Sequence, residues 1–326
     1  MLTEFHFDED FFSATDLNGP TAPLVNNTLL NFWFDRGCLL YPFSSVSKYQ
    51  EWEKKIPAKF SKKWMTALTD GRTCDFSDNY QRMASFENMK QVAIKYGDLD
   101  VDLILVPNEF NALGLSVKKE IVREQNIEVS KINGLLNSKS YLKSIELSSK
   151  GIKADEDINT IWSERFCKVA KHSKVITIVD RYLGENLLKD LEIRGRKTAI
   201  DNFVRFLSQT GRKFSITIYT DCGEELSNTH NEVSNHFRLR MKNSPSYKST
   251  LSTIRVVSCL SKNFAKYSHD RFLCFDSIVY EIGRGFDMFR GIKTRATTIS
   301  AKNKSNSGFD YSVGELAGIY EWSEDY

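Results

Sequence analysis

Three polar side chains stand at fixed spacing in the segment 268–289. His269 and Arg271 are two residues apart, and Asp276 follows in the same stretch. Because residues two apart on a β-strand point to the same face, this spacing predicts an imidazole and a guanidinium side by side. Both groups donate charge-assisted hydrogen bonds, and a guanidinium matches phosphate oxygens in pairs. The segment therefore predicts a phosphate-binding site; a structural histidine and a surface arginine are the simpler alternatives.

A glycine pair follows the apolar run 277–282. Gly283 and Gly285 flank Arg284, and glycine allows backbone conformations that are closed to other residues. We expect a turn here, with the Arg284 cation beside it. Close approach of a phosphate group to the Gly283 backbone is a second use of the same turn.

The order of these residues resembles the H-x-K-x4-D motif of phospholipase D-like phosphodiesterases, which is followed by G-S or G-G. Here the string is His269, Arg271, Asp276 and then, after six intervening residues, Gly283. It looks most like the C-terminal phospholipase D-like domain found attached to MIT domains, and like its bacterial relatives. The family lysine is Arg271 in this chain. Arginine keeps the charge and gains bidentate geometry, but the two residues are not interchangeable, and the change favours binding over turnover.

In that family the histidine attacks phosphorus and forms a phosphohistidine, the lysine holds the non-bridging oxygens, and the aspartate orients the histidine. The resemblance implies these catalytic roles for His269, Arg271 and Asp276, without a metal or any other cofactor. Asp276 as a plain turn residue is the alternative. A second motif supplies a second histidine as general acid. This chain shows one motif, so the resemblance implies a homodimer that brings two copies of His269 together.

A second group of candidates follows the apolar run 174–179. Asp180 and Tyr182 stand at its carboxyl end, where open α/β sheets place their ligands. A strand-Asp-x-Tyr element is also part of the resemblance, which extends over about residues 156–300. A helix cap is the alternative role for Asp180. The predicted phosphate-binding residues are His269, Arg271, Gly283, Arg284, Asp180 and Tyr182.

Strands and helices must alternate to position these residues. Apolar runs predict strands at 174–179, 214–219, 252–258 and 294–300, and helical patterns cover 155–170, 198–207 and 224–241. This alternation indicates an α/β fold, with a phospholipase D-like mixed sheet flanked by helices. We expect this phospholipase D-like domain to comprise residues 151–326.

The preceding residues, 1–150, predict a smaller α+β domain. Residues 1–25 indicate an irregular arm or an edge strand, and 27–34 fits either a helix or a strand. A helix is expected at 88–96, a buried strand at 101–106, and a polar helix over 118–136. Unlike residues 156–300, residues 1–150 show no motif that resembles a known family.

The composition of the chain limits the classes of ligand and the cellular locations that we expect. The 326 residues carry a net charge of only +3, which by itself does not indicate nucleic-acid binding. Six cysteines occur without a C-x-x-C pair, which argues against a zinc site and fits a reducing cytoplasm. The acidic start lacks the basic region of a signal peptide, and no apolar run approaches a membrane span. We therefore expect a cytoplasmic protein without a transmembrane segment.

Two functions of different classes remain open from the sequence. The first is a homodimeric phosphodiesterase, a metal-independent nuclease that the resemblance places among bacterial anti-phage defence effectors. The second is a non-catalytic module that grips a phosphate of nucleic acid or of a phospholipid head group, and leaves the N-terminal domain to act or to recruit a partner protein. A structural subunit with a vestigial pocket is a third hypothesis.

Overall fold

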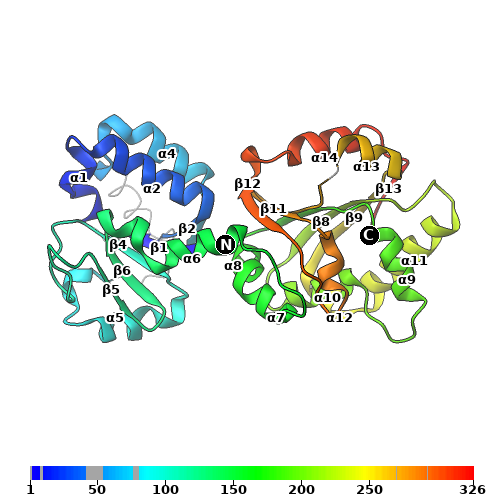
Figure 1. Ribbon diagram of the computed structural model, residues 1–326, viewed down its shortest axis with the longest axis horizontal. Coiled ribbons are helices and arrows are strands. Elements are labelled where there is room, and N and C mark those ends of the chain that lie inside the picture. The colour runs from blue at the N-terminus through cyan, green and yellow to red at the C-terminus, as the bar shows by residue number, and fades with distance from the viewer. Residues whose placement is uncertain (1, 8–9, 42–53, 76–80, 269, 292) are drawn as a thin grey trace. The chain divides into compact units, whose positions relative to one another are not determined.

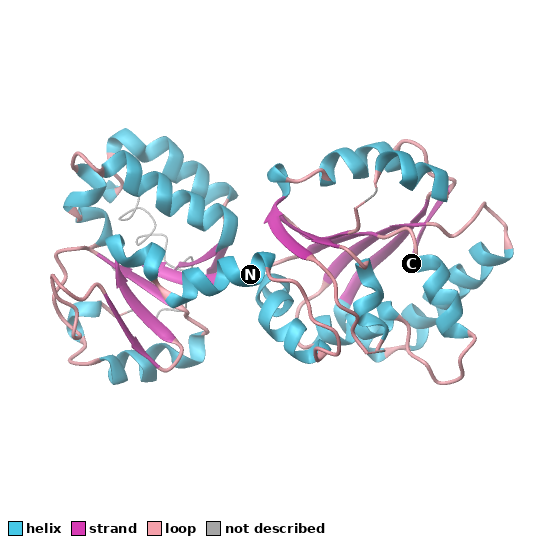
Figure 2. Cartoon of the chain, viewed as in Figure 1, coloured by secondary structure: helices cyan, strands magenta, loops and turns pink. Residues whose placement is uncertain are grey.

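The computed structural model describes residues 2–7, 10–41, 54–75, 81–268, 270–291 and 293–326 (Figure 1). The chain divides into two compact units, Met1–Glu146 and Leu147–Tyr326. The sequence predicts a division slightly later, after residue 150. In each unit, helices cover a mixed sheet on both faces (Figure 2).

The first unit contains a six-stranded sheet in the order β3-β2-β1-β4-β6-β5. Its strands are β1 (Thr3–Phe7), β2 (Gly37–Tyr41), β3 (Thr73–Asp75), β4 (Leu103–Val106), β5 (Ile121–Glu124) and β6 (Ile127–Lys131). Every neighbouring pair is parallel except β5 with β6. Its helices are α1 (Thr15–Asn18), α2 (Ala22–Arg36), α4 (Ser61–Asp70), α5 (Met89–Tyr96) and α6 (Lys139–Ser149). A mostly parallel sheet with intervening helices is of the α/β type rather than the expected α+β type.

Alternate residues of these strands pack into two separate cores. Phe5 and Leu105 face a core with Trp33 of α2 and Trp64 of α4. Ile104 and its neighbours on the other face pack in a second core against α5. Figure 1 shows α2 and α4 on one side of this sheet and α5 on the other.

Two predictions for the first unit were wrong, and both failed on burial. Residues 3–7 form β1, which is buried throughout and pairs with strands on both sides, so it is neither an arm nor an edge strand. Residues 118–136 contain the hairpin of β5 and β6 instead of a polar helix, with Gln125 at φ 53° in its turn. The buried strands β1 and β6 include polar residues, namely Glu4, His6, Glu128, Ser130 and Lys131. Residues 88–96 and 101–106 form α5 and β4 as expected.

The second unit contains a seven-stranded sheet in the order β12-β11-β10-β7-β8-β9-β13. Its strands are β7 (Val175–Val179), β8 (Phe214–Thr220), β9 (Leu251–Ser258), β10 (Phe272–Phe275), β11 (Ile278–Ile282), β12 (Ile299–Asn303) and β13 (Trp322–Asp325). The three strands β7, β8 and β9 are parallel, and the outer pairings are antiparallel. The strands predicted at 174–179, 214–219 and 252–258 are confirmed. The strand predicted at 294–300 was placed too early, because β12 begins at Ile299 and ends at Asn303.

Helices enclose this sheet as the periodicity indicates. They are α7 (Ile158–Ile161), α8 (Cys167–Lys171), α9 (Leu183–Leu191), α10 (Ala199–Ser208), α11 (Asn228–Asn243), α12 (Pro245–Thr250), α13 (Ser261–Tyr267) and α14 (Phe309–Ala317). Helix α10 begins with a capping box, in which Thr198 and Asp201 exchange side-chain and backbone hydrogen bonds. No helix in the described part of the chain combines the length and the apolar character that a bilayer crossing needs.

Two cores hold the second unit together. On one face of the sheet, Val179 and Phe272 pack with Phe264 of α13 and Phe309 of α14. On the other face, Phe203 of α10 contacts the rings of Trp162, Phe275, Phe286 and Phe289 at centroid distances of 5.0–6.2 Å. The last two rings belong to the 3₁₀ helix Gly285–Arg290, so the core anchors the segment that follows β11.

Candidate functional site

Three strand ends meet at one edge of the second sheet. Asp180 follows the last residue of β7, Arg271 precedes the first residue of β10, and Gly283 follows the last residue of β11. Because β10 is antiparallel to both neighbours, its beginning lies beside their carboxyl ends. The sheet thus brings together residues from two distant parts of the sequence, at the edge where α/β sheets place their ligands.

Asp180 is a buried support rather than a surface ligand. Its carboxylate accepts hydrogen bonds from the backbone N–H of Tyr182 at 3.0 Å and of Phe286 at 2.7 Å, and only 4% of the residue is exposed. Burial raises the pKa of Asp180 to about 6, although these two N–H groups and Arg271 act in the opposite direction. A buried anion would not contact a phosphate, so its role in the site is to hold its neighbours.

Arg271 is held on three sides. Its Nε lies 3.7 Å from Oδ1 of Asp180, its Nη1 donates to the carbonyl oxygen of Gly283, and its Cζ lies 5.0 Å from the ring centroid of Tyr182. The side chain is still 26% exposed. A guanidinium that is fixed before a ligand arrives loses less conformational entropy on binding than a free surface arginine.

Gly285 permits this close packing. Its φ is +61°, and a Cβ atom there would lie 2.1 Å from Oδ2 of Asp180 and 2.4 Å from Cδ of Arg271. Both the backbone conformation and the space therefore require glycine. Gly283 is constrained differently, because a Cβ atom would lie 2.6 Å from Oγ1 of Thr298. The two glycines predicted as a turn bring the chain against the Asp180–Arg271 pair.

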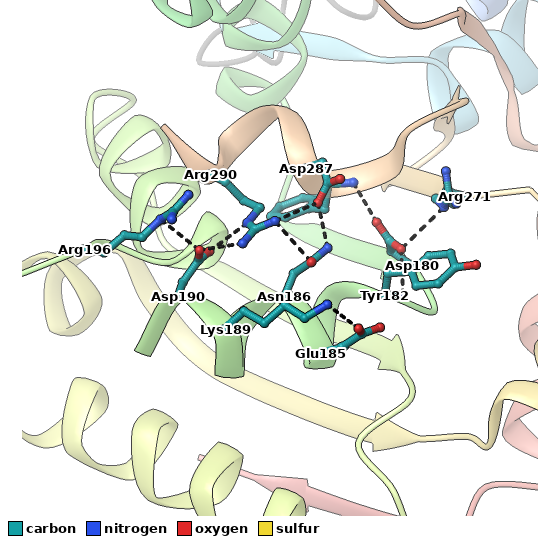
Figure 3. A network of polar contacts seen from close by, with 11 residues as sticks. Asp180, Tyr182, Glu185, Asn186, Lys189, Asp190, Arg196, Arg271, Asp287 and Arg290 are labelled. Carbon is teal, nitrogen blue, oxygen red and sulfur yellow. Dashed lines mark hydrogen bonds and ion pairs between the residues drawn. The ribbon is translucent and has the colours of Figure 1, made fainter. Parts of the chain in front are cut away.

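Helix α9 supplies the second wall of the site. Glu185, Asn186 and Lys189 line a cleft of about 450 Å³ together with Tyr182, Arg271, Gly283, Arg284 and Asp287. Figure 3 shows these α9 side chains projecting from one side of their helix, below Asp287. Sequence reasoning missed Glu185, Asn186, Lys189 and Asp287. The available signal was their spacing: Lys189 lies four residues after Glu185 on a helix that starts directly after Tyr182.

The charges of the cleft are unevenly paired. Lys189 forms an ion pair with Glu185, and Asp287 accepts a hydrogen bond from Asn186 at 2.7 Å. Arg284 is exposed and its guanidinium forms no ion pair within the described part of the chain. Arg271 and Arg284 are therefore the cations best placed to meet an anion in the cleft.

A buried network anchors the floor of this region. Asp190 is fully buried and accepts two hydrogen bonds from Arg290, at 2.9 and 2.7 Å. Arg196 adds a contact of 2.9 Å to the same carboxylate. Arg290 also donates to Asn186 at 3.1 Å, which connects the network to the cleft wall (Figure 3).

Asp276 lies at the opposite end of β10 from Arg271. Its carboxylate accepts hydrogen bonds from the backbone N–H of Lys174 at 3.1 Å and of Val175 at 2.9 Å, and its φ is +48°. Five residues of extended chain span roughly 16–17 Å, so the structure does not bring Asp276 to Arg271. In place of the catalytic role that the motif implied, the geometry shows Asp276 closing the turn between β10 and β11 and tying it to the start of β7.

The predicted nucleophile, His269, is not among the residues that the structure describes. Its expected position beside Arg271 therefore stays a prediction. Arg271 itself precedes β10, although its carbonyl oxygen continues the ladder by accepting the N–H of Ile282 at 2.9 Å. Of the other predicted residues, Tyr182, Gly283 and Arg284 line the cleft and Asp180 lies beneath it.

The described residues show no metal centre, and the comparisons with family models and curated proteins identify no relative. Across the described residues, no three His, Cys, Asp or Glu side chains converge as metal ligands would. No family model matches the chain, and no curated protein matches it.

Proposed function

We propose that the second unit binds a phosphodiester in the cleft between α9 and the segment that follows β11. The supporting observation is Arg271, whose guanidinium is held by Asp180, Gly283 and Tyr182 and still faces the cleft. Such a preorganised guanidinium suits the paired oxygens of a phosphate. Arg284 adds a second cation to the same cleft.

We further propose that the protein is a phospholipase D-like phosphodiesterase that cleaves nucleic acid. The proposal rests on the spacing of His269, Arg271 and Gly283 in the sequence and on a mixed sheet flanked by helices. The cleft at the beginning of β10 adds a place for the substrate. A cytoplasmic nuclease of this kind would serve as an anti-phage defence effector.

In this mechanism an imidazole nitrogen of His269 forms a bond to phosphorus, and the bond from phosphorus to the leaving oxygen breaks. Arg271 would hold the non-bridging oxygens while negative charge builds on them. The leaving oxygen needs a proton, which a second His269 from another copy of the chain would supply as general acid. Water then attacks phosphorus and gives a proton back to that second imidazole, and the bond from phosphorus to the His269 nitrogen breaks, which releases the phosphate product. The mechanism therefore requires a homodimer.

A phosphate-binding module without turnover is the second candidate. The observation that favours it is the arginine at the position of the family lysine, since Arg271 already engages the carbonyl oxygen of Gly283 and the carboxylate of Asp180. A side chain committed to these contacts suits a fixed clamp. The first unit would then act or recruit a partner protein.

One experiment separates the two candidates. Calorimetric titration with the dinucleotide TpT, which has one phosphodiester, measures binding; a labelled single-stranded oligonucleotide in excess chelator measures cleavage. Arg271→Ala should weaken TpT binding by about 1.5–3 kcal/mol, the scale of hydrogen bonds to charged groups, whereas Arg271→Lys should recover part of it. Exposed Arg194, which lines no described part of the cleft, provides the matched control Arg194→Ala.

The outcomes are distinct. Chelator-resistant cleavage that is lost in His269→Ala, with TpT binding weakened only in Arg271→Ala, supports the nuclease. Arg271-dependent binding without cleavage of DNA, RNA or a generic phosphodiester supports the binding module. If Arg271→Ala and Arg194→Ala bind TpT with equal affinity, the proposal that Arg271 binds a phosphodiester is wrong.

A further inference from the structure

A smaller cleft of about 100 Å³ adjoins the one already described. Arg284 and Asp287 line both clefts, so the two share a wall. Lys293 and Arg295, which precede β12 in the chain, also line the smaller cleft. Lys293 and Arg295 do not line the larger cleft, so binding of a single phosphate at Arg271 would not involve them.

The smaller cleft has cationic charge without a structural use. Arg290 is committed to buried Asp190 through two hydrogen bonds. Lys293 faces Asp155 at 3.6 Å, but both side chains are largely exposed, and such pairs contribute little. Arg284 and Arg295 are exposed, and neither guanidinium forms an ion pair within the described ranges. Asp287 opposes them only in part, because it accepts a hydrogen bond from Asn186.

We propose that Arg284 and Arg295 form a second phosphate subsite, so that the two clefts together bind consecutive phosphates of a single-stranded nucleic acid. This inference rests on the proposed function, because Arg271 holds the first phosphate. A single strand presents a negative charge at each nucleotide, and a protein that tracks it needs cations placed in succession. Arg271, Arg284 and Arg295 meet that requirement across the two adjoining clefts.

The lining favours a polynucleotide over a phospholipid. A phospholipid would need an apolar path for its acyl chains beside the phosphate site. The described residues of both clefts include only Met288 as an aliphatic or thioether side chain, and it is 6% exposed. The apolar surface that remains is the ring of Tyr182, which is 37% exposed at the wall of the larger cleft. The guanidinium groups of Arg181 and Arg271 lie 4.6 and 5.0 Å from the centroid of this ring, so the ring helps to hold Arg271 and offers no path for acyl chains.

The test compares the dinucleotide TpT with the trinucleotide TpTpT, both without terminal phosphates, by isothermal titration calorimetry. They carry one and two phosphodiesters, so their difference reports the second subsite. We expect wild type to bind TpTpT roughly fivefold to tenfold more tightly than TpT, beyond the twofold statistical factor, because a second charge-assisted contact forms. Arg295→Ala should remove this gain and leave TpT affinity unchanged. It should also lower the salt slope for a longer oligonucleotide by about 0.7.

Arg194→Ala again serves as the matched control, since Arg194 is an exposed arginine outside the described lining of both clefts. If wild type turns over the ligands, the same series is measured in the His269→Asn background. Arg271→Ala should weaken TpT and TpTpT alike. Circular dichroism verifies that each variant is folded.

The possible failures can be told apart. If Arg295→Ala matches Arg194→Ala for TpTpT while Arg271→Ala still weakens TpT, the second subsite is overturned and the proposed function stands. If Arg271→Ala leaves TpT affinity unchanged, the proposed function fails. A DNA duplex that binds as tightly as its single strand would overturn the single-strand assignment. Arg295-dependent binding to phosphatidylglycerol vesicles, with equal affinities for TpT and TpTpT, would replace nucleic acid with a lipid surface.

Discussion

The guanidinium of Arg271 lies against the buried carboxylate of Asp180, with 3.7 Å between Nε and Oδ1. Asp180 follows β7 and Arg271 precedes β10, and the pairing of Val179 with Phe272 places the two residues at the same edge of the sheet. The same carboxylate accepts the N–H of Phe286, so it also fixes the segment after β11. One buried acid thus organises all three strand ends that form the cleft.

Asp180 should make the stability of the second unit depend on pH in a specific direction. Its pKa is raised from 3.8 to about 6, chiefly by burial, with a weaker upward contribution from Asp287. Between pH 4 and 6 the unfolded chain has lost this proton while the folded chain keeps it. Its contribution to the free energy of unfolding therefore falls as pH rises through this window, by at most about 3 kcal/mol.

Urea unfolding of wild type and Asp180→Asn from pH 4 to pH 7 checks this. His236 acts in the opposite sense, because burial lowers its pKa to about 4, so the difference between the two proteins is the informative quantity. Wild type should lose stability relative to Asp180→Asn as pH rises. A difference that is constant with pH would show that the pKa of Asp180 is the same in the folded and the unfolded chain.

Gly285→Ala should disrupt the site and destabilise the fold. The φ of +61° disfavours any side chain, and the new Cβ would collide with Asp180 and Arg271. Gly211→Ala is the matched control, because Gly211 has a φ of +68° but no atom lies within 4 Å of the position that its new methyl group would take. We expect the control to cost about 1 kcal/mol from backbone strain alone, and Gly285→Ala to cost at least about twice that.

Thermal unfolding and TpT titration measure the two effects. Gly285→Ala should also weaken TpT binding, since it displaces Arg271, whereas Gly211→Ala should not. Equal destabilisation by both substitutions would mean that the close approach to Asp180 does not constrain the site.

Asp276→Ala should lower stability without affecting phosphate binding. The substitution removes the acceptors for the N–H groups of Lys174 and Val175, which should cost about 1–3 kcal/mol. Asp276→Asn should cost less, because asparagine tolerates the positive φ and keeps one acceptor oxygen. Chemical denaturation gives the stability, and TpT titration gives the binding. A folded Asp276→Ala protein that no longer binds TpT would return Asp276 to the phosphate site.

Asp190→Ala should be among the most damaging single substitutions in the second unit. It leaves Arg290 without the buried carboxylate that binds it twice, and breaking a buried charge pair costs about 3–5 kcal/mol. Arg196→Ala is the graded comparison, because the Arg196 side chain is 23% exposed and makes one contact. We expect a loss of about 1 kcal/mol there. Free energies of unfolding for both variants, for Arg290→Met and for the double variant Asp190→Ala/Arg290→Met measure the coupling between Asp190 and Arg290. Equal losses for Asp190→Ala and Arg196→Ala would contradict this account.

The sequence by itself determined the elements whose signals are local. The runs at 174–179 and 214–219 form β7 and β8, because their apolar residues at alternate positions, such as Ile176, Ile178, Ile216 and Ile218, fill one buried face of the sheet. Thr198 and Asp201 start α10 because a cap is satisfied within one turn of chain. Tyr182, Gly283 and Arg284 could be expected at a ligand site from their places at strand ends and in a turn.

Only the tertiary structure decided which of these residues meet. Residues 4–7 alternate polar and apolar side chains, and the place of β1 at the centre of a sheet depends on partners far along the chain. Asp180 and Arg271 pair because β10 runs antiparallel to β7, and the short apolar segment 272–275 does not show with which strand it pairs or in which direction. The same direction carries Asp276 to the opposite edge. Motif spacing records distance along the chain, whereas strand pairing decides distance in space.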